Sequence, residues 1–219
     1  MITIKMEYGI ESCYKTFDEL LKMNDYDFIA EINCSNNKLT FLPKLPLYLV
    51  SLDCSNNKLT ELDELPPFLE SLNCNNNKLG VLPFLPNTLG WLYVSDNNLT
   101  ELPILPLSLR ILYCSNNKLN NLPELPRNVK YVYCINNNLT DLPDMPENLH
   151  YILYDTNPIY EFIDTYFYGN KTSYFEWKCS YKKIYSDKLA YWFLECKYNP
   201  KYKYCRDRVN TEYDELIKC

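Results

Sequence analysis

The sequence predicts an α/β repeat solenoid, in which short parallel strands stack side by side and extended segments return the chain to the next strand. The first observation is self-similarity at a period of twenty residues. The second is a pair of columns in that period, one always asparagine and one mostly cysteine: Asn37, Asn57, Asn77, Asn97, Asn117, Asn137 and Asn157, and Cys34, Cys54, Cys74, Val94, Cys114, Cys134 and Tyr154. The third is a pair of prolines three residues apart in most units, which excludes a helix from that segment.

The composition of the chain excludes several function classes. Of the 219 residues, 47% are apolar, so a core can form, whereas the four glycines build no phosphate-binding loop. The N-terminus lacks the apolar run of a signal peptide, and no stretch approaches the roughly 18 apolar residues of a membrane span. We therefore expect a cytoplasmic protein without membrane partners, whose ten cysteines are reduced thiols.

The charge of the chain is unevenly distributed. Residues 161–219 hold 11 Lys and Arg against 9 Asp and Glu, a net charge of +2. Because the whole chain has a net charge of −6, residues 1–160 carry −8. An acidic array lacks the basic patch that nucleic-acid binding requires, so we expect no nucleic-acid partner.

Residues 1–28 are predicted to form an N-terminal cap made of a short strand and a helix. The segment Ile2–Met6 alternates apolar and polar residues, which indicates a strand. Thr16 and Glu19 fit a capping box, and we expect a helix from about Tyr14 to Asn24. Its role would be to cover the exposed end of the first repeat.

Residues 29–160 form the array, with seven units that begin at Ile29, Leu49, Leu69, Leu89, Leu109, Val129 and Leu149. Each unit is apolar at its first, fourth, sixth and eleventh positions and has asparagine at its ninth. In this pattern the chain resembles the leucine-rich repeat proteins. The resemblance implies about seven short parallel strands on the concave face of the array and extended, polyproline-like segments on the convex side.

The second half of the unit sharpens the resemblance. Its repeated motif is Leu-Pro-x-Leu-Pro, at residues 42–46, 82–86, 102–106 and 122–126, and the second unit departs from it with Leu62-Asp63. Twenty-residue units of this kind resemble those of bacterial effectors of the YopM and IpaH class, and also those of giant-virus leucine-rich repeat proteins. The resemblance implies a host protein as partner.

Residues 161–219 break the period and are rich in aromatic residues. We expect two helices there, at about Thr172 to Lys197 and, after Pro200, at about Lys201 to Lys218. The segment from Trp192 to Leu216 resembles the C-terminal tails of giant-virus repeat proteins. The simplest role for this aromatic-rich helical tail is to cap the array.

Packing and turns account for the two columns. The column cysteines alternate with outward positions of the strand, so we expect them in the core, where buried cysteine behaves as a small apolar residue. Val94 occupies the same column, which argues against a disulfide or metal ladder. At the turn after each strand, the asparagine amide is expected to bond main-chain groups that the bend leaves unpaired.

No enzyme site is predicted, and neither a metal nor a cofactor. The tail cysteines Cys179, Cys196, Cys205 and Cys219 are separated by 17, 9 and 14 residues, unlike the close pairs of zinc sites. The segment Cys205-Arg206-Asp207 matches the C-x-D of IpaH-type ubiquitin ligases, but the tail is several times shorter than their catalytic domain. His150 is the one histidine, and no nucleophile is identified beside it.

The candidate site lies at the outward positions of the strands, the third and fifth of each unit. These positions are small, polar or acidic in the first three units and mostly aromatic from the fourth unit on, and Arg110, Lys130 and His150 lie beside the aromatic half. The predicted partner-binding residues are Trp91, Tyr93, Ile111, Tyr113, Tyr131, Tyr133 and Tyr151. Contiguous exposed aromatic residues are typical of interface cores.

These observations favour a non-catalytic scaffold that binds a protein partner on its concave face. The aromatic residues also fit two structural alternatives: the C-terminal helices could fold back and bury them, or they could reflect a general bias toward tyrosine. The alternative functions are ubiquitin transfer or an adaptor role carried by the tail.

Overall fold

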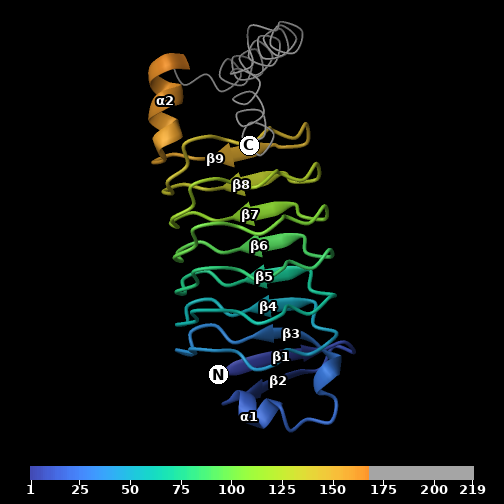
Figure 1. The fold of residues 1–219 in the computed structure, drawn as a ribbon. Coiled ribbons are helices and arrows are strands. Elements are labelled where there is room, and N and C mark those ends of the chain that lie inside the picture. Colours follow the sequence, from blue (N-terminus) through green and yellow to red (C-terminus); the bar gives the residue numbers. More distant parts are fainter. Residues whose placement is uncertain (168–219) are drawn as a thin grey trace, which may run out of the picture. The chain divides into compact units, whose positions relative to one another are not determined.

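The computed structural model describes residues 1–167, and its side chains to residue 164. The chain divides into two compact units, Met1–Phe162 and Ile163–Cys219. In the first unit, a nine-stranded sheet has the order β2-β1-β3-β4-β5-β6-β7-β8-β9, and Figure 1 shows its strands stacked like rungs. The strands are β1 (Ile2–Met6), β2 (Glu11–Tyr14), β3 (Ile29–Asn33), β4 (Ser51–Asp53), β5 (Ser71–Asn73), β6 (Trp91–Tyr93), β7 (Ile111–Tyr113), β8 (Tyr131–Tyr133) and β9 (Tyr151–Leu153).

Strands β3 to β9 are parallel and pair in register, with partners twenty residues apart such as Leu52 and Leu72. The middle residue of each three-residue strand is buried, whereas the flanking two face outward and are half-buried in β4 to β8. The segments between strands contain neither helix nor strand, as their prolines require. The predicted leucine-rich repeat solenoid with parallel strands is confirmed.

The asparagine column forms a buried ladder. The side-chain amide of Asn97 donates to the carbonyls of Cys74, Val94 and Ser95 at 3.0, 3.2 and 3.1 Å. Its Oδ1 accepts from the main-chain N–H of Leu79 at 3.0 Å. The same pattern recurs at Asn57, Asn77, Asn117, Asn137 and Asn157. Each amide therefore joins its own turn to the unit before it, as the sequence predicts.

The residue just before each asparagine of the column has a left-handed backbone. Its φ lies between 54° and 59° in every unit from Asn36 to Thr156. Asparagine and aspartate tolerate this conformation better than other residues with a Cβ, which explains why they hold this position in six of the seven units. Some of them also bond one another, and Asn76 Nδ2 donates to Asn56 Oδ1 at 2.7 Å.

The core is a column of leucines with cysteines between them. Cys34, Cys54, Cys74, Cys114 and Cys134 have no exposed surface. Burial raises the pKa of the Cys34 and Cys74 thiols to about 12, because a thiolate is poorly solvated among leucines. At neutral pH these groups are protonated and pack as apolar side chains.

The N-terminal segment differs from its prediction. β1 forms where the alternating pattern predicts a strand. A second strand, β2, then pairs antiparallel with β1, and Tyr14 of β2 lies opposite Ile2 of β1. The predicted helix is present but shorter than expected: Tyr14 belongs to that strand, and helix α1 contains Phe17–Leu20 rather than the range from about Tyr14 to Asn24. The predicted cap at its start is present, since the Glu19 N–H donates to Thr16 Oγ1 at 3.4 Å. A 3-10 turn, η1 (Tyr26–Phe28), leads into β3.

Helix α2 (Pro158–Phe167) follows the last strand and was not predicted. Proline suits the first turn of a helix. The Ile159 N–H donates to the Leu139 carbonyl at 2.9 Å, and in the preceding unit the Asn138 N–H donates to the Leu119 carbonyl in a similar way. The two helices predicted between Thr172 and Lys218 lie outside the described residues. Among the helices that the structure describes, none combines the length and apolar character of a membrane span.

We predict that Asn97→Ala lowers the free energy of unfolding by about 3 kcal/mol, because it leaves the buried Leu79 N–H without a partner and removes one of the hydrogen bonds that the carbonyls of Cys74, Val94 and Ser95 accept. Urea unfolding monitored by circular dichroism measures the change. The adjacent Asn98 is exposed, so Asn98→Ala is a matched control that should change the value by less than about 0.5 kcal/mol. Equal effects of the two substitutions would contradict the ladder's role.

We also predict that Cys74 resists alkylation by iodoacetamide at pH 8, where its buried thiol, with a pKa of about 12, stays protonated. Cys13 is exposed and should react under the same conditions. Peptide mapping by mass spectrometry distinguishes the two residues, and repeating the reaction in urea should label both. Rapid native labelling of Cys74 would show that the core opens.

Candidate functional site: the outward face of the sheet

The seven predicted partner-binding residues lie on one face of the sheet, which we call the aromatic face. In-register pairing places Trp91, Ile111, Tyr131 and Tyr151 in one row and Tyr93, Tyr113 and Tyr133 in a second. Six of the seven side chains are half-buried, and Tyr151 is 48% exposed. This placement follows from strand alternation, because the third and fifth positions share a side of the sheet.

The tyrosines of the second row stack on one another. The ring centroids of Tyr93 and Tyr113 are 5.2 Å apart, and those of Tyr113 and Tyr133 are 4.1 Å apart and nearly parallel. Tyr151 meets Tyr133 edge-on at 6.2 Å. The stack holds each ring in place, so the face is ordered before any partner arrives.

Cationic and polar side chains border the first row. The Arg110 guanidinium lies 5.8 Å from the centre of the Trp91 ring, within the range of a cation–π contact. His150 contacts Tyr131 edge-on, with ring centroids 5.6 Å apart and Nδ1 3.5 Å from the hydroxyl. The sequence places these residues beside the aromatic half, but it cannot show which ring each one contacts.

The stack changes the acidity of its central member. Burial raises the pKa of the Tyr113 hydroxyl above its ordinary value, and hydrogen bonding to Tyr133 and the charges of Tyr133 and Tyr93 raise it further. The phenol therefore stays neutral at physiological pH. Tyr113 thus offers a partner a hydroxyl group and no phenolate charge.

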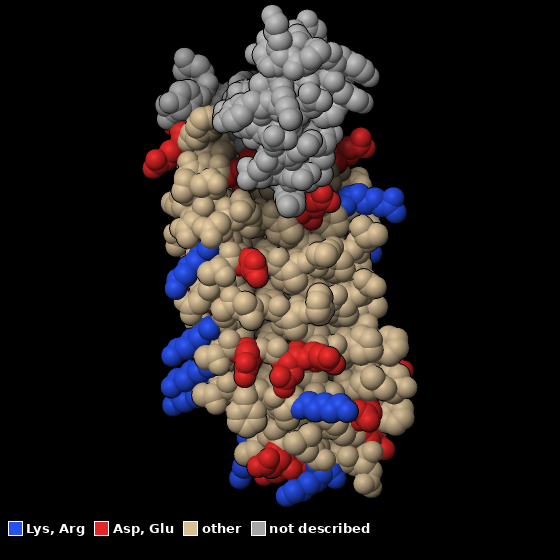
Figure 2. Space-filling model, in the orientation of Figure 1, with Lys and Arg blue, Asp and Glu red and all other residues tan. Residues whose placement is uncertain are grey.

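The N-terminal end of the same side of the sheet is charged, and the sequence analysis missed part of it. The hairpin β1–β2 extends the sheet beyond the first repeat, and Lys5 forms an ion pair with Glu31 at 3.0 Å. A hollow of about 380 Å³ lies there, lined by charged residues that include Glu11 and Asp53. Figure 2 shows charged side chains gathered over this end, whereas the surface over β5 to β7 carries few. The register of β1 against β3 brings Lys5 to Glu31, and no sequence motif encodes it.

The other predicted reactive residues add no site here. Cys179, Cys196, Cys205 and Cys219 lie outside the described residues. Within the described part of the chain, no cluster of three His, Cys, Asp or Glu side chains is arranged to hold a metal ion. His150 is exposed and contacts Tyr131 rather than a nucleophile.

Comparisons with known proteins agree with this architecture. The Leucine Rich Repeat family model matches residues 48–72. The leucine-rich repeat domain of a Shigella effector is 38% identical with a TM-score of 0.57, over 58% of this chain and 59% of that one. YopM from Yersinia enterocolitica is 34% identical with a TM-score of 0.53, over 60% of this chain and 34% of its own. No curated protein sequence matches significantly.

A second YopM structure, from Yersinia pestis, is 38% identical with a TM-score of 0.53, over 58% of this chain and 43% of its own. The chain therefore spans less than two thirds of each of these proteins. It is a leucine-rich repeat solenoid that resembles bacterial effectors of the YopM and IpaH class. The likeness to giant-virus repeat proteins stays a prediction.

We predict that Tyr133→Phe lowers the pKa of Tyr113 toward its ordinary value. The substitution removes a hydroxyl whose hydrogen bond and whose charge both raise that pKa. NMR titration of ring-labelled tyrosine measures this pKa. Tyr160→Phe, outside the stack, is a control that should leave it unchanged. An unshifted Tyr113 after Tyr133→Phe would show that the two hydroxyls do not interact.

Proposed function

We propose that this chain is a non-catalytic scaffold that binds a protein partner through the aromatic face, which forms the concave face of the array. The observation that carries the proposal is the ordered tyrosine stack, with ring centroids 5.2 and 4.1 Å apart. Stacked rings offer a large contact area with few rotatable bonds to immobilise, and their hydroxyls remain available to a partner.

The surroundings of the aromatic face suit an interface. Arg110 and Lys130 are exposed beside the tyrosines, so a partner with carboxylates at its rim would be favoured there. The N-terminal end of the sheet is acidic and would favour basic groups. The two ends therefore give the partner a preferred direction along the array.

The nature of the partner is proposed from the likeness to effectors. Leucine-rich repeat domains of bacterial effectors are 34–38% identical to this chain over 58–60% of its length. We infer that the partner is a host protein and that binding occurs in the cytoplasm of the host cell. The repeat array would select the partner without carrying out chemistry on it.

We predict that Tyr113→Ala with Tyr133→Ala weakens binding of a captured partner at least about tenfold, because truncation of central aromatic contacts typically costs more than 1 kcal/mol. The partner is first captured from host-cell lysate by cross-linking to the full chain. Its affinity for each variant is then measured by calorimetry. The matched control is Tyr48→Ala with Phe68→Ala, a pair whose rings stack 5.7 Å apart outside the outward face of the sheet. Unchanged affinity of the first variant would refute the proposal.

A further inference from the structure

A second apolar surface lies on the return segments, away from the aromatic face. Phe84 and Ile104 occupy the sixteenth position of neighbouring units and are 91% and 86% exposed. Val81 and Leu107, on the same two segments, are 56% and 66% exposed. We call these four residues the return-segment patch.

The fold does not require apolar residues at these places. The other units carry Lys44, Glu64, Glu124 and Asp144 at the sixteenth position, and the leucines and prolines around them still fold into the same segment. A large apolar side chain that is almost fully exposed contributes nothing to the core. Two of them in adjacent units make a contiguous patch of the kind that marks an interaction site.

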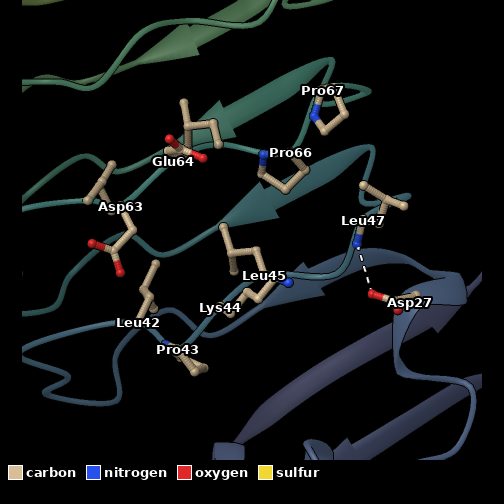
Figure 3. A pocket seen from close by; sticks show the side chains of 12 residues that line it. Asp27, Leu42, Pro43, Lys44, Leu45, Leu47, Asp63, Glu64, Pro66 and Pro67 are labelled. Atoms are coloured by element: carbon tan, nitrogen blue, oxygen red, sulfur yellow. Dashed lines mark hydrogen bonds between the residues drawn. The ribbon is translucent and has the colours of Figure 1, made fainter.

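A groove lies on the return segments of the units that precede the patch. It has a volume of about 550 Å³ and lies between the return segments of the first two units. Its apolar walls come from Leu42, Leu45, Leu62, Leu65, Pro43, Pro66 and Pro67. Asp63 stands where five other units have a proline, and Figure 3 shows its carboxylate pointing toward Leu42 across the groove. The groove thus combines an apolar lining with three carboxylate side chains, Asp27, Asp63 and Glu64, and one cation, Lys44.

Carboxylates surround the groove and the patch. Glu61, Asp63 and Glu64 lie on the N-terminal side, Glu101 lies beside the patch, and Glu124 lies on the C-terminal side. All five are exposed, and the structure records no ion pair between any of them and another described residue. Lys44 and Arg127 are the cations at the sixteenth and nineteenth positions of the described units. A ligand for this surface therefore needs apolar side chains flanked by positive charges.

We propose that the return-segment surface, made of the groove and the return-segment patch, binds a basic peptide segment of another protein. An apolar side chain of the peptide enters the groove, a second packs on Phe84 and Ile104, and neighbouring Lys or Arg residues meet the surrounding carboxylates. This site is separate from the aromatic face and does not depend on the function proposed for that face.

The test is selection of random 12-residue peptides, displayed on phage, against the full chain. We expect enriched sequences to combine large apolar residues with Lys or Arg. The selected peptide should bind the double variant Phe84→Ser with Ile104→Ser at least about tenfold more weakly than the unchanged chain. The matched control is Tyr8→Ser with Ile10→Ser, an exposed aromatic residue and an exposed isoleucine of the N-terminal hairpin, which should leave affinity unchanged.

Two further variants separate charge from surface area and this site from the aromatic face. Asp63→Asn with Glu64→Gln should weaken peptide binding and reduce its dependence on salt, because both carboxylates are exposed. Tyr113→Ala with Tyr133→Ala should leave it unchanged. Enrichment of neutral or acidic peptides, no enrichment at all, or binding that survives loss of Phe84 and Ile104 would overturn the proposal. So would sedimentation that shows Phe84 and Ile104 holding two copies of the chain together.

Discussion

The structure depends on the buried asparagine amide that each unit places against the unit before it. A three-residue strand pairs few main-chain groups, and the bend that follows would leave several carbonyls and an N–H buried without partners. One side-chain amide satisfies these groups in two units at once, as Asn97 does for the carbonyls of Cys74 and Val94 and the N–H of Leu79. Every unit is thereby held in one register, and the leucines and cysteines stack in columns behind it.

This constraint explains why the array could be predicted and its ends could not. A fixed period of twenty residues determines which positions are buried, so the parallel strands, the core cysteines and the shared side of Trp91 and Tyr113 follow from the sequence. The N-terminal hairpin has no copy elsewhere in the described residues, and its pairing depends on contacts such as Ile2 opposite Tyr14. Side-chain packing between units, including the Tyr113–Tyr133 stack and the Arg110–Trp91 contact, depends on rotamers that no pattern encodes.

The repeated positions that build the core leave the surface positions free to vary. The outward side of the sheet and the return segments differ in the residues at these positions. The outward side of the sheet changes along the array from charged to aromatic, with Glu31 and Asp53 at one end and Tyr113 and Tyr133 at the other. The return segments instead place apolar residues in the middle, at Phe84 and Ile104, with carboxylates on both sides. Neither arrangement affects the core, so each surface can serve a separate protein contact.

The matching upper and lower faces of every unit also have an evolutionary consequence. The Leu79 N–H after β5 donates to Asn97 of the next unit, and the Leu119 N–H after β7 donates to Asn137 in the same way. A duplication or loss of twenty residues therefore brings together two units whose surfaces form the same hydrogen bonds. Such an event would preserve the frame while moving the acidic end of the sheet relative to the tyrosines by one strand spacing, about 4.8 Å. The distance between the two ends can therefore evolve in whole steps, and selection can match the array to the dimensions of what it binds.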